Sequence, residues 1–202
     1  MIRYRIVAFQ PTMQTEDPRV ARSKAAIFDA TLELLSEQGF VGTSVDAIAA
    51  RSGVAKTTIY RHWPTKSELV FDAFESIVRP PTLEPTGSLR DDLITLLSGL
   101  ARVLNDERLG PLLVSMIEGA EHDTELADLR RRYSRERRQV GRELVVAAID
   151  HGDLLSDTDP DLVLGMLAGT LPYRRMVSGE RVGPALVREV VDRVLRAHAA
   201  RE

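Results

Sequence analysis

The residues between Ser44 and Trp63 include side chains of the kinds that contact DNA. The polar ones that fall together late in this segment are Lys56, Thr57, Thr58, Tyr60, Arg61 and His62. Basic and hydroxyl side chains donate hydrogen bonds to base edges and phosphate oxygens, which is how proteins read and hold a duplex. Ile59 and Trp63 lie four residues apart, so a helix here buries both on one side. The pattern predicts a helix with a buried apolar stripe and an outer face for nucleic acid.

The charges around this segment support the same interpretation, although the whole chain is acidic. Its formal net charge is −3 and its pI is about 5.9, which by itself does not favour nucleic acid as a partner. From residue 51 to residue 67, in contrast, there are basic residues and no acidic residue. The absence of carboxylates from this segment predicts a local basic surface that binds the phosphates of nucleic acid. A chance gap in a short window is the alternative.

Two short helices must position this face. The first is expected over Ser44–Arg51, with Thr43 as its N-cap and Asp46 in the place of a capping-box acid. The second, over Ala55–His62, follows a short turn that contains Gly53, and glycine gives such a turn the backbone freedom it needs. Two short helices joined in this way form a helix-turn-helix. An ordinary helical hairpin with a polar face is the alternative.

The segment from Gly39 to Leu69 reads GFVGTSVDAIAARSGVAKTTIYRHWPTKSEL and strongly resembles the TetR (tetracycline-repressor) family of transcriptional regulators. Members usually show Gly-Phe, Thr-Ser/Thr, an Ile-Ala helix, Gly-Val and Tyr-x-His-Phe/Trp, followed by Lys and Leu. The resemblance covers roughly Ala21–Phe74. The chain departs from the pattern at Ala55-Lys56-Thr57-Thr58, where many relatives have Ser-x-Gly-Thr or Ser-x-Ala-Thr. The operator sequence therefore does not follow from the resemblance.

The resemblance implies roles for individual residues. The residues of the recognition helix expected to contact base edges are Lys56, Thr57, Thr58 and Arg61. Those expected near the DNA backbone are Thr43, Ser44, Tyr60, His62 and Lys66. Thr43 and Ser44 lie at a helix N-terminus, whose free amides favour a phosphate. Trp63, in the place of the family's usual Phe, is expected in the core.

The rest of the chain also reads as helix. Apolar residues recur at helical spacing from Pro18 to Gln38, with Gly39 as a stop, and no stretch alternates like a strand. The Pro- and Gly-rich segment Arg79–Gly87 is the best boundary. We expect an all-α chain of about nine helices with four parts: an extension at 1–16, a helix-turn-helix domain at 17–64, a linking helix at 65–79, and a ligand-binding and dimerisation domain at 80–202.

Two surfaces of the second half follow mainly from the resemblance. Methionine and aromatic side chains line adaptable pockets, and the candidates are Met116, Tyr133, Met166 and Tyr173. Ordinary core packing is the alternative for each. Apolar residues at helical spacing in the last two helices resemble the family's dimer interface and predict a homodimer. The candidates for that interface are Leu162, Leu167, Leu186, Val190 and Val194.

The sequence gives little support for metal, cofactor or catalytic sites. The chain has no cysteine, which excludes disulfides and thiolate metal sites. Glu118 and His122 are four residues apart, as two metal ligands could be, but a solvated helix end is the preferred interpretation. The arginine-rich stretch Leu129–Glu143 is interpreted as the solvated or acid-paired face of a long helix. No phosphate-binding glycine loop or nucleophile elbow is present. We expect no metal, no cofactor and no enzymatic activity.

These observations together predict a ligand-responsive DNA-binding regulator, in this family most often a repressor. It would bind a palindromic operator as a homodimer and be released by a small-molecule effector. No apolar stretch approaches the roughly 20 residues that cross a bilayer, so no membrane partner and a cytoplasmic location are expected. Two starts are open for the chain: translation from Met13, or from Met1 with an N-terminal arm in which Arg3 and Arg5 touch DNA.

Overall fold

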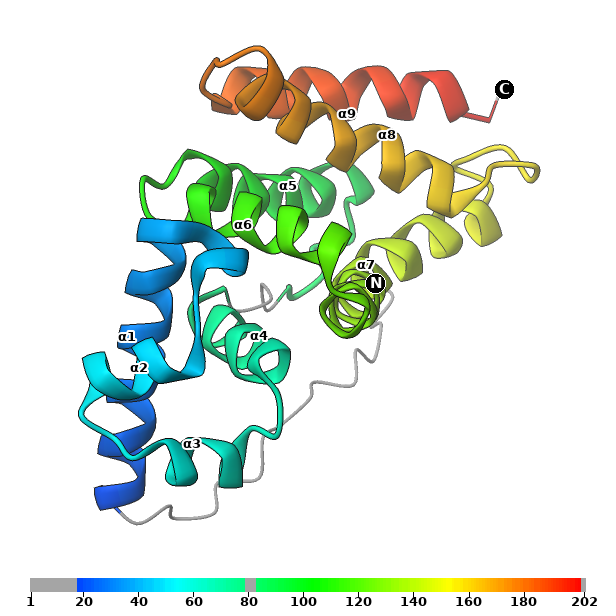
Figure 1. Ribbon diagram of the computed structural model, residues 1–202. Coiled ribbons are helices and arrows are strands. Elements are labelled where there is room, and N and C mark those ends of the chain that lie inside the picture. Colours follow the sequence, from blue (N-terminus) through cyan, green and yellow to red (C-terminus); the bar gives the residue numbers. More distant parts are fainter. Residues whose placement is uncertain (1–17, 79–82, 201–202) are drawn as a thin grey trace. The chain divides into compact units, whose positions relative to one another are not determined.

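A computed structural model describes residues 18–78 and 83–200 of the chain (Figure 1). The N-terminal extension, with its two starts, lies outside the described residues. Within them the chain forms α-helices and one π-helical turn, without any β-strand, which confirms the all-α prediction. The elements are α1 (Pro18–Gly42), α2 (Val45–Ser52), α3 (Lys56–His62), α4 (Lys66–Ile77), α5 (Leu89–Asn105), α6 (Leu109–His122), α7 (Thr124–His151), α8 (Pro160–Pro172), η1 (Tyr173–Val177) and α9 (Pro184–His198). None of these helices combines the length and apolar character needed to cross a membrane.

The described chain divides into two compact units. The amino-terminal unit contains α1 to α4, α6 and the start of α7, that is, residues 18–78 and 107–133. The carboxy-terminal unit contains α5, the rest of α7, α8 and α9, that is, residues 83–106 and 134–200. Residues 80–202 are predicted to form one domain, whereas α6 packs on α1 and belongs to the amino-terminal unit.

The amino-terminal unit is built around α1, which packs against α2, α4 and α6. Its core joins side chains from α1, α2, α3 and α4 and from Trp63, which directly follows α3. The members are Ile27, Ala30, Leu34, Val45, Ile48, Ile59, Trp63 and Leu69. Regular helical geometry in α1 is interrupted at Gly39, which has φ of 69°, a left-handed conformation that favours glycine. The first and longer part of α1 therefore ends at Gly39, as predicted, and a short helical turn continues to Gly42.

Side chains cap several of the helix starts. The side chains of Thr65, Ser88 and Asp159 accept hydrogen bonds from the first turns of α4, α5 and α8. At α2 the prediction of Thr43 is wrong by one residue, because Ser44 has the extended backbone and its Oγ accepts from the amide of Ala47 at 3.2 Å. Adjacent hydroxyl residues are both good caps, so the sequence alone did not separate them.

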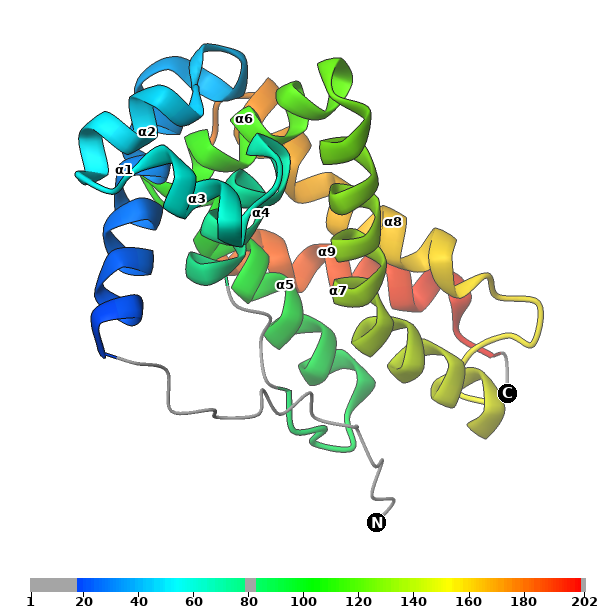
Figure 2. The same cartoon turned by 60° about the horizontal axis from the view of Figure 1, so that its bottom comes forward.

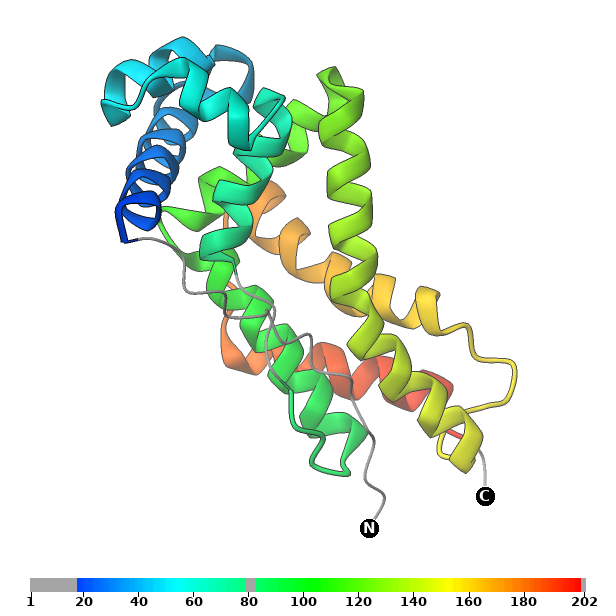
Figure 3. The same ribbon diagram turned by 90° about the horizontal axis from the view of Figure 1, so that it is seen from below.

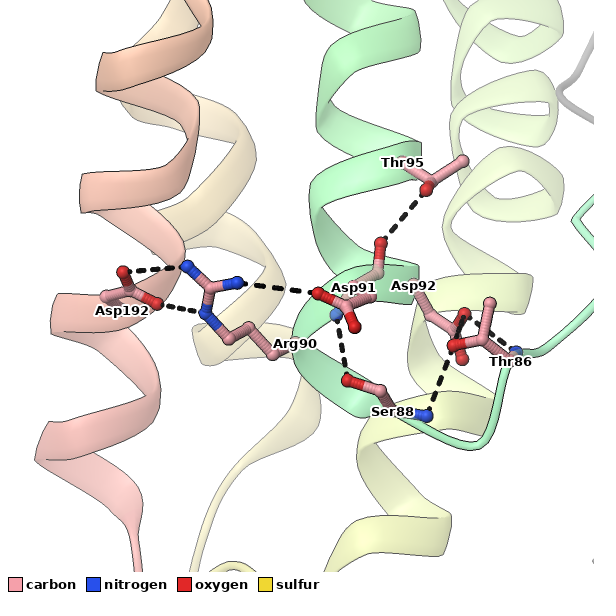
Figure 4. A network of polar contacts seen from close by, with 7 residues as sticks. All are labelled: Thr86, Ser88, Arg90, Asp91, Asp92, Thr95 and Asp192. Carbon is pink, nitrogen blue, oxygen red and sulfur yellow. Dashed lines mark hydrogen bonds and ion pairs between the residues drawn. The ribbon is translucent and has the colours of Figure 1, made fainter.

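In the carboxy-terminal unit α5, α8 and α9 pack against one another, and a polar network fixes the start of α5 (Figure 4). The Arg90 guanidinium forms two hydrogen bonds with the Asp192 carboxylate of α9, at 2.6 and 3.0 Å. This pairing holds the pKa of Asp192 below its ordinary value. Buried Asp92 accepts hydrogen bonds from the amide and the hydroxyl of Thr86, at 2.9 and 2.8 Å, which closes the connection in front of α5.

Candidate nucleic-acid interface

α2 and α3 form the predicted pair of short helices and lie next to each other (Figures 1 and 2). Gly53 ends α2 with φ of 69°, and its amide donates to the carbonyl of Ala49 at 3.1 Å. Ile48 from α2 and Ile59 from α3 are completely buried and belong to the same core. The tight turn at glycine therefore sets α3 across α2, as a helix-turn-helix requires.

The two sides of α3 differ as the sequence predicts. Ile59 and Trp63 are buried, and the Trp63 Nε1 donates to the Asp72 carboxylate of α4 at 2.9 Å. The other side carries the exposed residues Lys56, Thr57, Tyr60, Arg61 and His62, with Thr58 half-buried. The view of Figure 3 brings α3 to the reader's side of the amino-terminal unit. The structure thus presents the polar face of α3 outwards on a rigid apolar base.

Lys56 at the start of α3 is held by two neighbours. Its Nζ pairs with the carboxylate of Asp46 on α2 at 2.6 Å, and it lies 5.8 Å from the centre of the Tyr60 ring. The hydrogen bond that Lys56 donates to the Asp46 carboxylate raises the pKa of Lys56, so the ammonium stays charged. Asp46 therefore braces α3 instead of completing the predicted capping box, which does not form because Ser44 is the cap.

Arg51 does not belong to the exposed basic face, although it lies in the acid-free part of the sequence. Its guanidinium hydrogen-bonds to Glu37 at 3.0 Å and to Glu33 at 3.3 Å, both on α1. The bond from Arg51 lowers the pKa of Glu37. Acidic residues from outside the window thus neutralise this charge.

Lys66 has acceptors that the sequence did not indicate. Its Nζ donates to the carbonyls of Phe40 and Thr43, at 2.9 and 3.2 Å, and lies 3.9 Å from the centre of the Phe40 ring. Burial lowers the pKa of Lys66. Thr43 is itself buried, and its hydroxyl donates to the carbonyl of Gly39 at 2.7 Å. Thr43 and Ser44, at the start of α2, are both expected to contact the DNA backbone, but only Ser44 is exposed.

A groove of about 260 Å³ runs beside the end of α3, between α1 and α4. Its basic lining comes from Arg19 and Lys24 of α1 together with Arg61 and His62 of α3. The one acidic residue in the lining, Asp72, already accepts the bond from Trp63. The basic face therefore extends onto α1. Sequence reasoning missed this part because Arg19 and Lys24 lie far from α3 along the chain.

The four candidate pocket residues do not share one environment. Met116 is buried, and Tyr133 donates its hydroxyl to the carbonyl of Val78 at 3.0 Å while its ring packs edge-on against Phe71. These two residues belong to the amino-terminal unit. Met166 and Tyr173 belong to the carboxy-terminal unit and are 37% and 63% exposed.

The candidate interface residues divide between surface and core. Leu162 is 57% exposed, whereas Leu167 and Val190 are buried and face the interior of their own unit. Leu186 and Val194 are half-buried. Leu167 on α8 and Val190 on α9 therefore pack within the chain, because periodicity alone does not show which apolar side of a helix faces inwards.

The possible metal pair and the arginine-rich stretch both lie on the surface of helices. Glu118 and His122 pair at 3.6 Å on the surface, and no group of three or more His, Asp or Glu gathers within the described residues. In the arginine-rich stretch of α7, Arg131 pairs with Asp128, and Arg142 lies 3.5 Å from Asp161. Acid pairing on a helix surface is the interpretation that the sequence favoured.

Two family models match the chain. Residues 27–73 match one described as bacterial regulatory proteins, tetR family, and residues 83–194 match one described as tetracyclin repressor-like, C-terminal domain. An uncharacterized HTH-type transcriptional regulator, YdeS of Bacillus subtilis, is 33% identical over 176 residues, covering 86% of this chain and 88% of the relative.

Two further comparisons agree. The DNA-binding transcriptional repressor TetR of Mycobacteroides abscessus is 31% identical over 176 residues, covering 85% of this chain and 90% of the relative. Among solved structures, the TetR family transcription regulator SCO0332 is 30% identical with a TM-score of 0.63, covering 87% of this chain and 97% of that one.

Proposed function

Since the chain belongs to the TetR family of helix-turn-helix transcriptional regulators, we propose that it binds a palindromic DNA operator as a homodimer. The observation that carries this proposal is the outer face of α3, where Lys56, Thr57, Tyr60, Arg61 and His62 are exposed while Ile59 and Trp63 anchor the helix. We propose a regulator that represses transcription, as the named function of the Mycobacteroides abscessus relative suggests, and not an enzyme.

Within this proposal α3 enters the major groove. Lys56, Thr57, Thr58 and Arg61 contact base edges, and Tyr60 and His62 contact the backbone. The exposed N-terminus of α2 at Ser44 offers its free amides to a phosphate. A homodimer presents two copies of α3 to successive turns of the duplex, about 34–36 Å apart.

The proposal is tested by selection from a pool of random-sequence duplexes with the full-length chain. Enrichment of a pseudopalindrome with half-sites about 10 base pairs apart is expected. A Thr57→Ala/Arg61→Ala variant, which keeps Ile59 and Trp63, serves as the control and should enrich nothing. Failure of the wild-type chain to enrich any sequence would rule out operator binding. The enriched sequence is called the selected duplex below.

Replacing Lys66 by methionine is expected to weaken binding to the selected duplex without changing its salt dependence. Methionine keeps the apolar stem but removes the donors to the carbonyls of Phe40 and Thr43, so the turn before α2 loosens. A residue that contacts phosphate would instead lower the slope of log K against log salt by about 0.9. Fluorescence anisotropy at a series of salt concentrations separates the two roles, and a reduced slope would return Lys66 to the phosphate contacts.

The dimer part of the proposal rests on an exposed apolar face of α8 that continues onto the first residue of η1. Its members recur at helical spacing and are all exposed: Leu162, Gly165, Met166, Gly169 and Tyr173. A Cβ placed on Gly165 or Gly169 would meet nothing within 4 Å, so packing inside the chain does not require these glycines to be small. Contiguous exposed apolar side chains mark interaction surfaces. A helix of a second copy, packed closely over the two glycines, accounts for both features.

A Met166→Glu variant is therefore expected to be monomeric in light scattering at concentrations where the wild type is a dimer. The carboxylate would be buried without a partner at the centre of the apolar face, which costs several kcal/mol. Leu155→Glu is the matched control, because Leu155 is also partly exposed, at 39% against 37% for Met166, but lies outside α8. A dimeric Met166→Glu variant would exclude this face.

Release by a small molecule is the last part of the proposal. An effector that binds the carboxy-terminal unit and prefers a conformation unsuited to DNA would shift the population away from the bound form. The four candidate pocket residues do not identify the effector. Screening small molecules for loss of anisotropy with the selected duplex tests this part, and a library in which none releases the duplex would count against it.

A further inference from the structure

The turn between α1 and α2 determines where the helix-turn-helix begins. Phe40 is buried, and its carbonyl accepts both the amide of Thr43 at 3.3 Å and the ammonium of Lys66 at 2.9 Å. Ser44, the cap of α2, follows at once. Phe40 is therefore hydrogen-bonded to the residue before the cap of α2, and the shared core of Ile48 and Ile59 joins α2 to α3.

The backbone of α6 lies directly against the Phe40 side chain. A Cβ placed on Gly119 would lie 2.6 Å from the Cγ of Phe40, 2.7 Å from its Cβ and 2.8 Å from its Cδ1. Carbon atoms of separate residues do not approach this closely, and two of the three, Cβ and Cγ, are the first atoms of the side chain and do not move when the ring turns. Phe40 cannot avoid the contact by rotating its ring, so its backbone or α6 would have to move.

The end of α6 is also tied to α4. The buried hydroxyl of Ser67 donates to the Asp123 carboxylate at 3.0 Å, and the same oxygen of Asp123 accepts the amide of Leu126 at 2.8 Å, which caps α7. Residues on both sides of the helix-turn-helix, Phe40 before it and Ser67 after it, are thus held against the α6–α7 junction.

We infer that Gly119 is a positioning residue for DNA reading: only glycine lets α6 sit on Phe40, and this seating sets the orientation of α2 and α3. The inference rests on the proposed function. It extends the functional DNA-binding unit from residues 18–78 to include α6, which the sequence assigns to the other half of the chain. A merely structural role would change stability but would leave the preference for the selected duplex over a scrambled one intact.

The test compares Gly119→Ala with Gly99→Ala in the full-length chain. Both changes place a better helix former inside a helix, but a Cβ on Gly99 of α5 meets nothing within 4 Å. Gly99→Ala should bind as the wild type does. Gly119→Ala should lose about tenfold or more in affinity for the selected duplex, because base contacts that lose their alignment are each worth that much. Its affinity for a scrambled duplex should stay close to that of the wild type, and its helix content and oligomeric state should be retained.

Wild-type affinity of Gly119→Ala for the selected duplex, or an equal loss on both duplexes, would overturn the inference. If Gly119→Ala is unfolded at the assay temperature, Phe40→Leu decides, because it removes ring atoms from beneath α6 without a new clash. Selective loss on the selected duplex is again expected, and an unchanged preference would refute the role. If the wild type selects no duplex, the proposed function fails first and the positioning role fails with it.

Discussion

Replacing Trp63 by alanine is expected to cost about 3–5 kcal/mol of the free energy of unfolding, the usual cost of removing a large buried aromatic side chain. Trp63 is 5% exposed, and its ring lies 5.4 Å from that of Phe28. It also closes the core between α1, α3 and α4 through the bond to Asp72. Folded domains are stable by about 5–15 kcal/mol, so the variant should lose much of its folded population on mild heating. Urea denaturation followed by circular dichroism gives the value.

Trp63→Phe is the matched control for this change. Phenylalanine keeps most of the packing against Phe28 but loses the Nε1 donor. Asp72 is exposed and can return to water, so a cost of about 1 kcal/mol is expected. If both variants lost equal stability, the hydrogen bond to Asp72 and not the ring would hold α3 in place. Fluorescence is not useful here because Trp63 is the chain's single tryptophan.

Replacing Arg61 by alanine is expected to reduce the affinity for the selected duplex by about 1–3 kcal/mol and to relax base preference at one position of each half-site. Arg61 is exposed near the end of α3, beside the groove that α1 completes. A guanidinium gives two parallel hydrogen bonds to guanine, and alanine gives none. Repeating the duplex selection with the variant shows which base position loses its preference.

Two control variants separate the recognition of bases from the general attraction of a positive charge to DNA. Arg61→Lys keeps the positive charge and should retain affinity for a scrambled duplex while losing preference for the selected one. Arg51→Ala removes an arginine that Glu33 and Glu37 already engage, so base preference should not change. An Arg61→Ala variant with an unchanged base preference would assign Arg61 to the backbone.

The features predicted from the sequence are those whose cause lies within a few residues. Gly39 and Gly53 take positive φ where a helix must end, and Ile59 and Trp63 point inwards because they are four residues apart. These are consequences of backbone sterics and helical period. The fold class and the exposed face of α3 follow from them.

The features not predicted depend on partners that come from other helices. The acceptors of Lys66 are main-chain carbonyls, which every residue has, so they leave no trace in the sequence. The acids that hold Arg51 are on α1, outside the window in which the charges were counted. Leu167 and Leu162 look alike along the chain, and only the packing of α8 shows that the first is core and the second is surface.

The contact between Gly119 and Phe40 also has an evolutionary consequence. While a phenylalanine is retained at position 40, any substitution at position 119 adds a Cβ within 3 Å of it and should be removed by selection. In a lineage where position 40 has become glycine, position 119 is released and should drift to alanine or serine. The two sites, far apart in the sequence, are thus expected to change together across descendants of a common ancestor.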